Sequence, residues 1–211
     1  MRFAVLALSA ILASGAFGAG CARGAVEPAA SKGQPKPVYD KQTGKLTMVT
    51  LDSKGDGKID TWSYMDGARI VRIEIDRDGD GRVDRWEYYG VDLKIEKIGM
   101  SRANDGTVDA WAYPAPDGGI ARMDISTKRD GRVTRREFYD AGVLVRAEED
   151  TQGAGRIDKW ETYRDGGLTM VAFDDKHRGV PTRRLVYLPG GQVRVEVDPN
   201  GTGNFVPAGS R

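Results

Sequence analysis

The sequence is poor in the residues on which disulfides, zinc sites and most nucleophilic catalysis depend. Cys21 is the only cysteine and His177 the only histidine, so a second thiol for a disulfide and a partner ligand for zinc are both missing. No GxSxG, HExxH or P-loop motif occurs, and no cysteine–histidine pair is available as nucleophile and base. These absences predict that the protein is not an enzyme.

The sequence also lacks an excess of either charge and a long apolar run beyond residue 20. The net charge is +1, from 32 lysines and arginines against 31 acidic residues, which argues against a nucleic-acid partner. No stretch after residue 20 is apolar for long enough to span a bilayer as a helix. With 39% hydrophobic and 30% charged residues, the chain has the composition of a water-exposed domain of ordinary size.

The first 37 residues differ in composition from the rest. Residues 1–20 combine one arginine, an apolar run and small residues, which is typical of a secretory signal peptide. A signal that ends at a lone cysteine resembles the N-terminus of bacterial lipoproteins, which implies acylation of Cys21, and Ala22 implies sorting to the outer membrane. An ordinary signal that leaves a free thiol is the alternative. Residues 21–37 then form the lipidated cysteine and a flexible tether.

A repeat of about 24 residues fills the remainder, which we assign as a repeat domain at residues 38–207 with a short tail at 208–211. Glycines recur at intervals of 24 or 25 residues, and an Asp or Ser stands five residues before each of them. These glycines are Gly57, Gly81, Gly106, Gly131, Gly155, Gly179 and Gly203. The spacing indicates about seven units, of which the last is incomplete.

The sequence pattern of each unit predicts two strands joined by a tight turn. Apolar residues alternate with polar ones, which is the period of a strand with one buried face. In the first unit Asp66-Gly67 is a favoured hairpin turn. With that turn, Trp62 lies opposite Val71 and shares an apolar face with Ile73. The expected fold is therefore all-β, with tandem β-hairpin repeats in an antiparallel meander that is elongated or rolled.

The segment DRDGDGRVDRWE, residues 76–87, has the ligand spacing of a calcium-binding EF-hand loop. The ligands predicted for calcium are the side chains of Asp76, Asp78, Asp80, Asp84 and Glu87 and the carbonyl of Arg82. So many carboxylates in one loop repel one another unless a cation is present. An acidic turn in water, rich in Asp and Gly because turns favour them, is the alternative. The first loop keeps Asp52, Asp56 and Asp60 and predicts a weaker site.

These loops lie between predicted strands, whereas an EF-hand loop lies between two helices. Their DxDxDG pattern resembles thrombospondin type 3 repeats and propeller loops, and the hairpin period resembles membrane occupation and recognition nexus repeats. We interpret the chain as a bacterial lipoprotein built of tandem β-hairpin repeats with EF-hand-like calcium loops.

The fourth and sixth loops and the strands after them carry basic residues where the second carries acids. These residues are Lys128, Arg129, Arg132, Arg135, Arg136, Lys176, His177, Arg178, Arg183 and Arg184. We expect the cations to pair with neighbouring acidic loops and so to take the place of a metal ion. A patch for an anionic ligand and plain solvation are the alternatives. His177, without a second histidine or cysteine nearby, is not a metal motif.

Four tryptophans occupy the same repeat position and form an aromatic stripe. They are Trp62, Trp86, Trp111 and Trp160. We expect the stripe to be core, covered by curling of the sheet or by a partner. The alternative is a platform on which sugar rings stack, because the segment RWEYYG resembles the hairpins of choline- and glucan-binding wall repeats.

Together these features predict an exported protein of the bacterial cell envelope that is lipid-anchored to the outer membrane. Its calcium is expected to be structural, and its sheet to act as a binding or scaffold module. The expected partners are the membrane, through Cys21, and envelope proteins or polysaccharide. A glycan- or wall-binding module and a purely structural scaffold are the alternatives.

Overall fold

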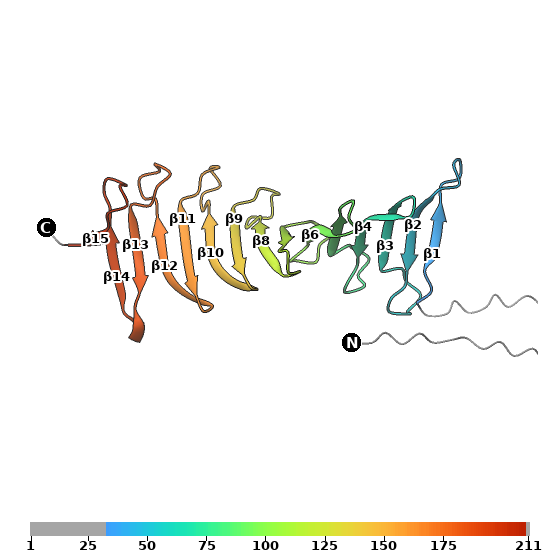
Figure 1. Cartoon of the computed structure of the whole chain (residues 1–211), viewed down its shortest axis with the longest axis horizontal. Coiled ribbons are helices and arrows are strands. Elements are labelled where there is room, and N and C mark those ends of the chain that lie inside the picture. Colours follow the sequence, from blue (N-terminus) through green and yellow to red (C-terminus); the bar gives the residue numbers. More distant parts are fainter. Residues whose placement is uncertain (1–32, 210–211) are drawn as a thin grey trace, which may run out of the picture. The chain divides into compact units, whose positions relative to one another are not determined.

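The computed structural model describes residues 33–209, so the predicted signal peptide, Cys21 and most of the tether lie outside the described residues. Fifteen strands form one sheet, in which every strand pairs with its sequence neighbours from β1 at one edge to β15 at the other (Figure 1). Within residues 33–209 there is no α-helix, and none that is long and apolar enough to cross a membrane. The all-β antiparallel meander is confirmed, and the sheet is open.

Successive strands alternate in direction, and a tight turn or a longer loop joins each to the next. The strands are β1 (Lys36–Tyr39), β2 (Leu46–Leu51), β3 (Thr61–Asp66), β4 (Arg69–Ile75), β5 (Arg85–Tyr89), β6 (Ile95–Met100), β7 (Ala110–Pro114), β8 (Ile120–Ile125), β9 (Arg135–Asp140), β10 (Val143–Glu149), β11 (Lys159–Arg164), β12 (Gly167–Phe173), β13 (Arg183–Tyr187), β14 (Val193–Val197) and β15 (Val206–Pro207). A 3-10 turn, Pro189–Gly191, joins β13 to β14. β1 begins two residues before the predicted start of the domain, and both edge strands contain a proline, Pro37 and Pro207.

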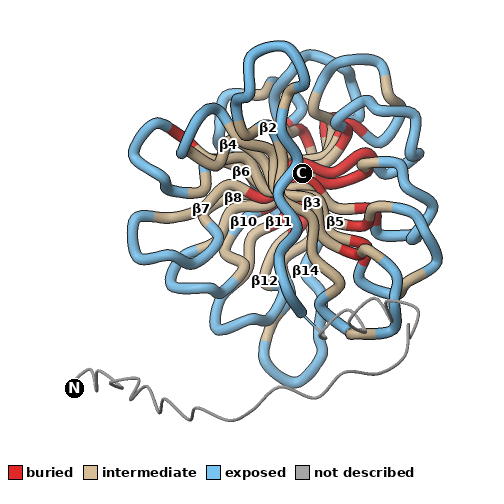
Figure 2. The backbone as a smooth tube through the Cα atoms, turned by 90° about the vertical axis from the view of Figure 1, so that its right-hand side faces the viewer, coloured by how far each residue is buried: buried red, intermediate tan, exposed pale blue. Residues whose placement is uncertain are grey.

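The sheet is a single layer that twists along its length. Figure 1 shows the strands following one another along the long axis, and Figure 2, viewed along that axis, shows them fanned around it. Paired strands have an intrinsic twist, and a β-bulge near the turn of six hairpins increases it. Most strand residues are half-buried, because only the side chains of neighbouring strands cover each face.

The register of the first hairpin differs from the sequence-based prediction. The turn lies one residue later than Asp66-Gly67, and the register shifts again at a β-bulge. Trp62 therefore pairs with Glu74, and the prediction that Val71 lies opposite it is wrong. Because an odd shift in register exchanges the two faces, the tryptophan stripe lies on the face opposite Ile73. We call the side that carries the stripe the tryptophan face.

On the tryptophan face, cations on one strand lie over aromatic rings on a neighbouring strand. Arg72 lies 4.1 Å from the ring centre of Tyr64, Arg122 4.0 Å from Tyr113, Arg146 3.8 Å from Phe138, and Lys97 4.8 and 4.6 Å from Tyr88 and Trp111. Each such contact contributes about 0.5–2 kcal/mol, the more so as it is desolvated. The rings are thus covered by stacked side chains in place of a second layer of structure.

The opposite face is apolar in its middle strands and ionic from β9 to β11. Its buried apolar residues are Ala110, Ala112, Ile125, Ala147 and Val171. The ionic part centres on Glu161, whose carboxylate accepts hydrogen bonds from Arg135 at 2.8 Å and Tyr163 at 2.8 Å and lies 2.7 Å from the ammonium of Lys159. Burial by itself raises the pKa of Glu161, but these hydrogen bonds outweigh it and lower that pKa to about 2.

This low pKa predicts how acid affects stability. The folded pKa of Glu161 lies below the ordinary value of 4.5, so the carboxylate stabilises the fold above about pH 4.5, and its contribution is lost as the pH falls towards 2. We expect Glu161→Gln to lower the melting temperature by about 4–8 °C at pH 7. At pH 2.5 most of that difference should disappear. Circular dichroism melts of both proteins at the two pH values test this, with the exposed Glu96→Gln as the control that shifts neither. An equal difference at both pH values would contradict the expectation.

Candidate functional site

Seven loops follow the even-numbered strands, and antiparallel pairing places all of them at the same side of the sheet, where those strands end. We call this side the loop edge, as distinct from the edge strands β1 and β15. We number them loop 1 (52–60), loop 2 (76–84), loop 3 (101–109), loop 4 (126–134), loop 5 (150–158), loop 6 (174–182) and loop 7 (198–205). Positions are counted from the Asp or Ser that opens each loop. Because the sheet twists, this loop edge winds around the long axis (Figure 2).

A buried aspartate closes loop 2 from within. The Asp76 carboxylate accepts the amide of Gly79 at 2.7 Å and that of Gly81 at 2.8 Å. Both glycines have positive φ, 84° and 89°, which turns their amides inward and explains why glycine stands at positions 4 and 6. Burial by itself raises the pKa of Asp76, but these two amides and the charge of Lys54 outweigh it and lower that pKa. The opening aspartates of loops 1, 5 and 7 accept the same two amides.

In loops 1 to 6 the residue at position 9 holds the start of the loop by accepting the amide of position 2. In loop 2 this acceptor is Asp84, whose Oδ2 lies 2.8 Å from the amide nitrogen of Arg77. In loops 1, 3 and 5 the second oxygen of the equivalent aspartate is also used, by Ser53, Arg129 or Thr151. The second oxygen of Asp84, Oδ1, is buried and has no hydrogen-bond partner.

That lone oxygen is unusual within residues 33–209. Three other buried side-chain atoms there make no hydrogen bond, but each lies 3.0 Å from an opposite charge, in the pairs Arg72–Glu74 and Arg122–Asp124. Asp84 Oδ1 has neither kind of partner. An unpaired buried carboxylate oxygen costs free energy, on the order of 1–3 kcal/mol or more for a charged group. A bound cation would remove that cost.

Two further carboxylates converge on Asp84. Oxygens of Asp76, Asp78 and Asp84 all lie within 4.8 Å of one another, and no other trio of potential ligands does so in the described part of the chain. Asp76 and Asp84 are buried and Asp78 is exposed. An acidic cluster that can hold a metal ion therefore occurs in the loop that the sequence singled out, with three of the predicted ligands in place.

Two other predicted ligands of loop 2, Asp80 and Glu87, accept hydrogen bonds from the protein. Asp80 is exposed and accepts the amide of Arg82 at 2.8 Å. Glu87 lies in β5, where its two oxygens accept hydrogen bonds from Arg85 and Tyr89, both at 2.7 Å. In the described structure Glu87 is thus held on the sheet, and it is not one of the three converging residues.

The acids of loop 1 all accept hydrogen bonds from their own loop. Asp52 accepts the amides of Gly55 and Gly57, at 2.6 and 2.8 Å. Asp60 accepts both the amide and the hydroxyl of Ser53. Asp56 is exposed and accepts the amide of the residue two positions later. These three carboxylates do not form a converging trio like that of loop 2.

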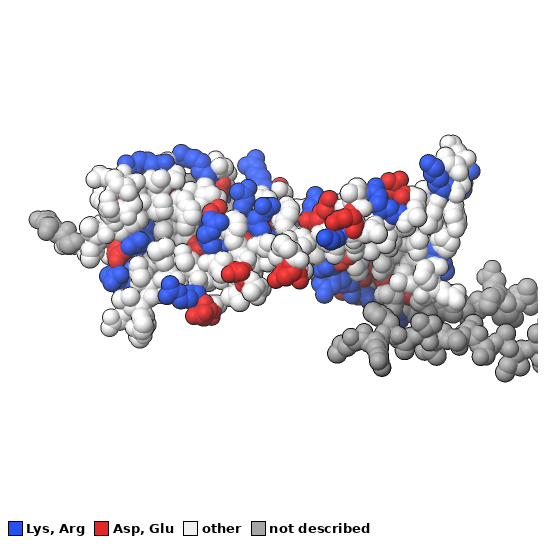
Figure 3. Space-filling model, viewed as in Figure 1, with Lys and Arg blue, Asp and Glu red and all other residues white. Residues whose placement is uncertain are grey.

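Side-chain contacts join each loop to the next along the edge. Arg129 of loop 4 pairs with Asp105 and, at 3.5 Å, with Asp109 of loop 3, which confirms for this arginine the expected pairing with an acidic neighbour. The remaining contacts are Asn104 to Asp78, Lys54 to Asp76, Lys128 to Gln152, Arg156 to His177, and Lys176 and Arg178 to Pro199. Most of these cations bind a main-chain carbonyl. Figure 3 shows lysines and arginines gathered over the loops near β12 to β14.

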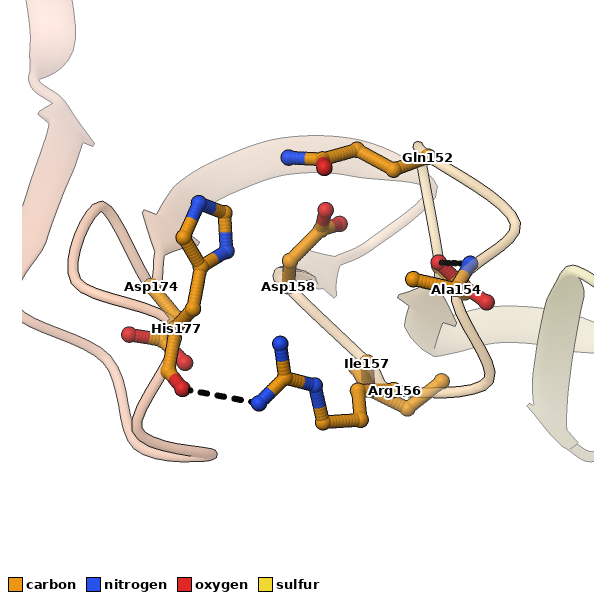
Figure 4. Close-up of a pocket in the computed structure, with 8 residues that line it drawn as sticks. Gln152, Ala154, Arg156, Ile157, Asp158, Asp174 and His177 are labelled. Atoms are coloured by element: carbon orange, nitrogen blue, oxygen red, sulfur yellow. Dashed lines mark hydrogen bonds between the residues drawn. The ribbon is translucent and has the colours of Figure 1, made fainter.

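A small cavity of about 20 Å³ lies between loops 5 and 6 (Figure 4). Gln152, Asp158 and His177 surround it, and Arg156 reaches below it to the carbonyl of His177 at 3.0 Å. Its volume is close to that of a single water molecule. His177 is exposed and belongs to no converging trio of ligands within residues 33–209.

The four stripe tryptophans lie at equivalent places in β3, β5, β7 and β11, and all are half-buried. The ring of Trp111 packs over Gly99, where a Cβ would come within 2.8 Å of it, and Lys97 lies over the same ring. The stripe exists as predicted, although on the face opposite to the one expected. A role in stacking sugar rings stays a prediction.

The sequence pattern did not predict two features of the site. One is the amide bonding that Asp76 and Asp84 share with their counterparts in other loops, and the other is the ammonium of Lys54 beside loop 2. The first has a sequence signal in the glycine at position 4 of loops 1, 2, 5 and 7, which the EF-hand spacing does not require.

No family model matches the chain, and no curated protein resembles it significantly. Among solved structures, the chain is similar to TarM, with 15% identity and a TM-score of 0.38 over 48% of this chain and 19% of TarM. It is similar at 16% identity and a TM-score of 0.26 to accessory secretory protein 1, 2 and 3 of Streptococcus pneumoniae, over 66% of this chain and 19% of that one. The chain thus spans about a fifth of either protein, and both likenesses are too distant to carry a function.

The internal closure of the loops predicts a large effect of one substitution. Asp150 of loop 5 accepts three amides, those of Gly153, Ala154 and Gly155, at 2.6–3.0 Å. We expect Asp150→Ala to lower the free energy of unfolding by about 3 kcal/mol, because three amides lose a charged and buried acceptor. Asp150→Asn, which keeps one acceptor oxygen, should lose less. Urea unfolding measures all three proteins, with the exposed Asp56→Ala expected to stay within about 1 kcal/mol of the wild type. A loss for Asp150→Ala no greater than that for Asp56→Ala would show that the aspartate does not close the loop.

Proposed function

We propose that the protein is an exported envelope module whose loop 2 binds a calcium ion that stiffens the edge of the sheet. The unpaired, buried Oδ1 of Asp84 carries this proposal. It is the one feature of loop 2 that the amide bonding common to the loops leaves unexplained. The converging oxygens of Asp76 and Asp78 supply the rest of a three-carboxylate donor set.

The chemistry of the donors favours calcium. All three are hard carboxylate oxygens, the type that calcium and magnesium take, and no thiolate or imidazole stands among them. Calcium accepts irregular coordination by six to eight oxygens, whereas magnesium requires near-octahedral geometry, so a loop already shaped by amide bonds suits calcium better. The amide bonds of Asp76 do not prevent coordination, since each carboxylate oxygen has two lone pairs.

The ion would act on structure rather than on a substrate. Loop 2 is tied to loop 1 through Lys54 and to loop 3 through Asn104, so a fixed loop 2 restrains both neighbours. Three carboxylates with few remaining ligands imply weak binding, with a dissociation constant of about 10⁻⁴–10⁻³ M as in extracellular calcium modules. That range suits an exported protein, and the lipid anchor at Cys21 and an envelope scaffold role are part of the same proposal.

Calorimetric titration of chelator-treated protein with calcium chloride tests the site through Asp84→Asn. Asparagine keeps an oxygen to accept the Arg77 amide but removes the charge, so the loop should still close while calcium binding weakens at least tenfold. The melting temperature of the wild type should rise with millimolar calcium, and that of the variant should not.

Asp158→Asn is the matched control, because Asp158 occupies the same position in loop 5 and its two oxygens are bonded to Thr151. It should bind calcium like the wild type. Wild-type protein that shows neither heat nor a melting shift at millimolar calcium would refute the proposal. Equal loss of binding in both variants would show that the heat comes from another place.

A further inference from the structure

Lys54 of loop 1 reaches into loop 2, next to the carboxylate cluster. Its Nζ lies 3.4 Å from the main-chain oxygen of Asp76, and a Cβ placed on Gly79 would lie 3.2 Å from the same nitrogen. Glycine at position 4 of loop 2 therefore gives the ammonium room to approach. In the described part of the chain Lys54 forms no ion pair within 4.0 Å, so its charge acts on the loop as a whole.

The same arrangement recurs along the edge. Position 3 is a lysine in loops 1, 4 and 6, and in each case the ammonium binds a main-chain oxygen of the next loop. The other two contacts are Lys128 to Gln152 at 3.1 Å and Lys176 to Pro199 at 3.0 Å. Each receiving loop opens with a buried aspartate and has glycine at position 4. Position 3 of loop 2 itself is Asp78, the exposed member of the cluster, so loop 2 receives a lysine and presents an acid.

A buried carboxylate is costly unless positive charge lies near it. In loops 5 and 7 the incoming lysine faces a single buried opening aspartate, Asp150 or Asp198. In loop 2 it faces three converging carboxylates, and one positive charge leaves that cluster with a net negative charge. The lysine therefore neutralises part of the cluster, and it opposes the binding of any further cation in proportion to the charge of that cation.

We propose that Lys54 is a tethered counterion of loop 2, which stabilises the Asp76–Asp78–Asp84 cluster when no metal is bound and competes with a metal ion for it. This inference rests on the proposed function and adds what sets the affinity of its site for cations. Without metal, the ammonium lowers the repulsion among the carboxylates. When a divalent ion binds, the two cations repel each other and the ammonium moves out into water.

Lys54→Met tests the role of the charge, because methionine keeps much of the apolar length of lysine. Removing a single positive charge about 6 Å from a divalent ion in water should tighten calcium binding about tenfold. The titrations are run at equal ionic strength in sodium chloride and in tetramethylammonium chloride, whose cation is too bulky for carboxylates to ligate. Because the lysine also repels sodium, sodium should weaken calcium binding more in Lys54→Met than in the wild type.

Melting temperatures measured in EDTA and in calcium distinguish a counterion role of Lys54 from a purely structural contact between loops 1 and 2. Without calcium, Lys54→Met should melt below the wild type because the cluster has lost its positive charge. With calcium it should melt at or above the wild type. The matched control is Lys128→Met, which removes the equivalent contact between loops 4 and 5. It should lower the melting temperature equally in both conditions and leave the affinity for calcium unchanged.

The outcomes separate this inference from the proposed function. If the wild type binds calcium and Lys54→Met has the same affinity and the same response to sodium, the counterion role is wrong and the calcium site stands. Binding by Lys54→Met alone would support the counterion role and overturn calcium binding by the natural chain. If neither protein binds calcium, both proposals fail.

Discussion

Each repeat depends on a carboxylate or hydroxyl at the first position of its loop, half-buried in Asp52 and buried in the six others. Asp76 and its counterparts collect inward-turned amides that would otherwise lack acceptors at the end of one strand and the start of the next. Where serine replaces aspartate in loop 3, the hydroxyl of Ser101 accepts the amide of Asp105 and donates to the carboxylate of the same residue. The loop geometry is therefore kept while the charge at its centre changes. Loops that share one backbone geometry can therefore differ in the number of carboxylates they offer to an ion.

A single-layer sheet must find its stability within each face. The tryptophan face uses cations stacked over rings, and the opposite face combines small apolar residues with the ionic cluster around Glu161. Such a fold buries little apolar surface per residue, and its stability is the sum of many similar contacts between neighbouring strands. Contacts between adjacent loops add a second series along one edge, from Lys54 to Pro199. Any ion fixed at loop 2 acts on both series at once.

The sequence was sufficient to predict the repeat, the strands and the loop that carries the acidic cluster, because periodicity and turn residues are local properties. The faces of the first hairpin were not predictable in this way. A β-bulge near the turn moves Trp62 opposite Glu74, and no residue type specifies that bulge. The ligand set was also only partly predictable. Glu87 stands at the spacing of a bidentate ligand, yet Arg85 and Tyr89 on the same strand bind it, and EF-hand spacing presumes a helix where this chain has β5.

The prolines of the two edge strands bear on what happens when many copies of the protein meet. An open sheet offers unpaired main-chain groups at both ends, which in general serve as templates for another chain. Pro37 in β1 and Pro207 in β15 lack the amide hydrogen that such a template would supply, and β15 is only two residues long. These features disfavour the pairing of further chains at the ends of the sheet. The length of the sheet is then a property of the gene and not of the protein's concentration.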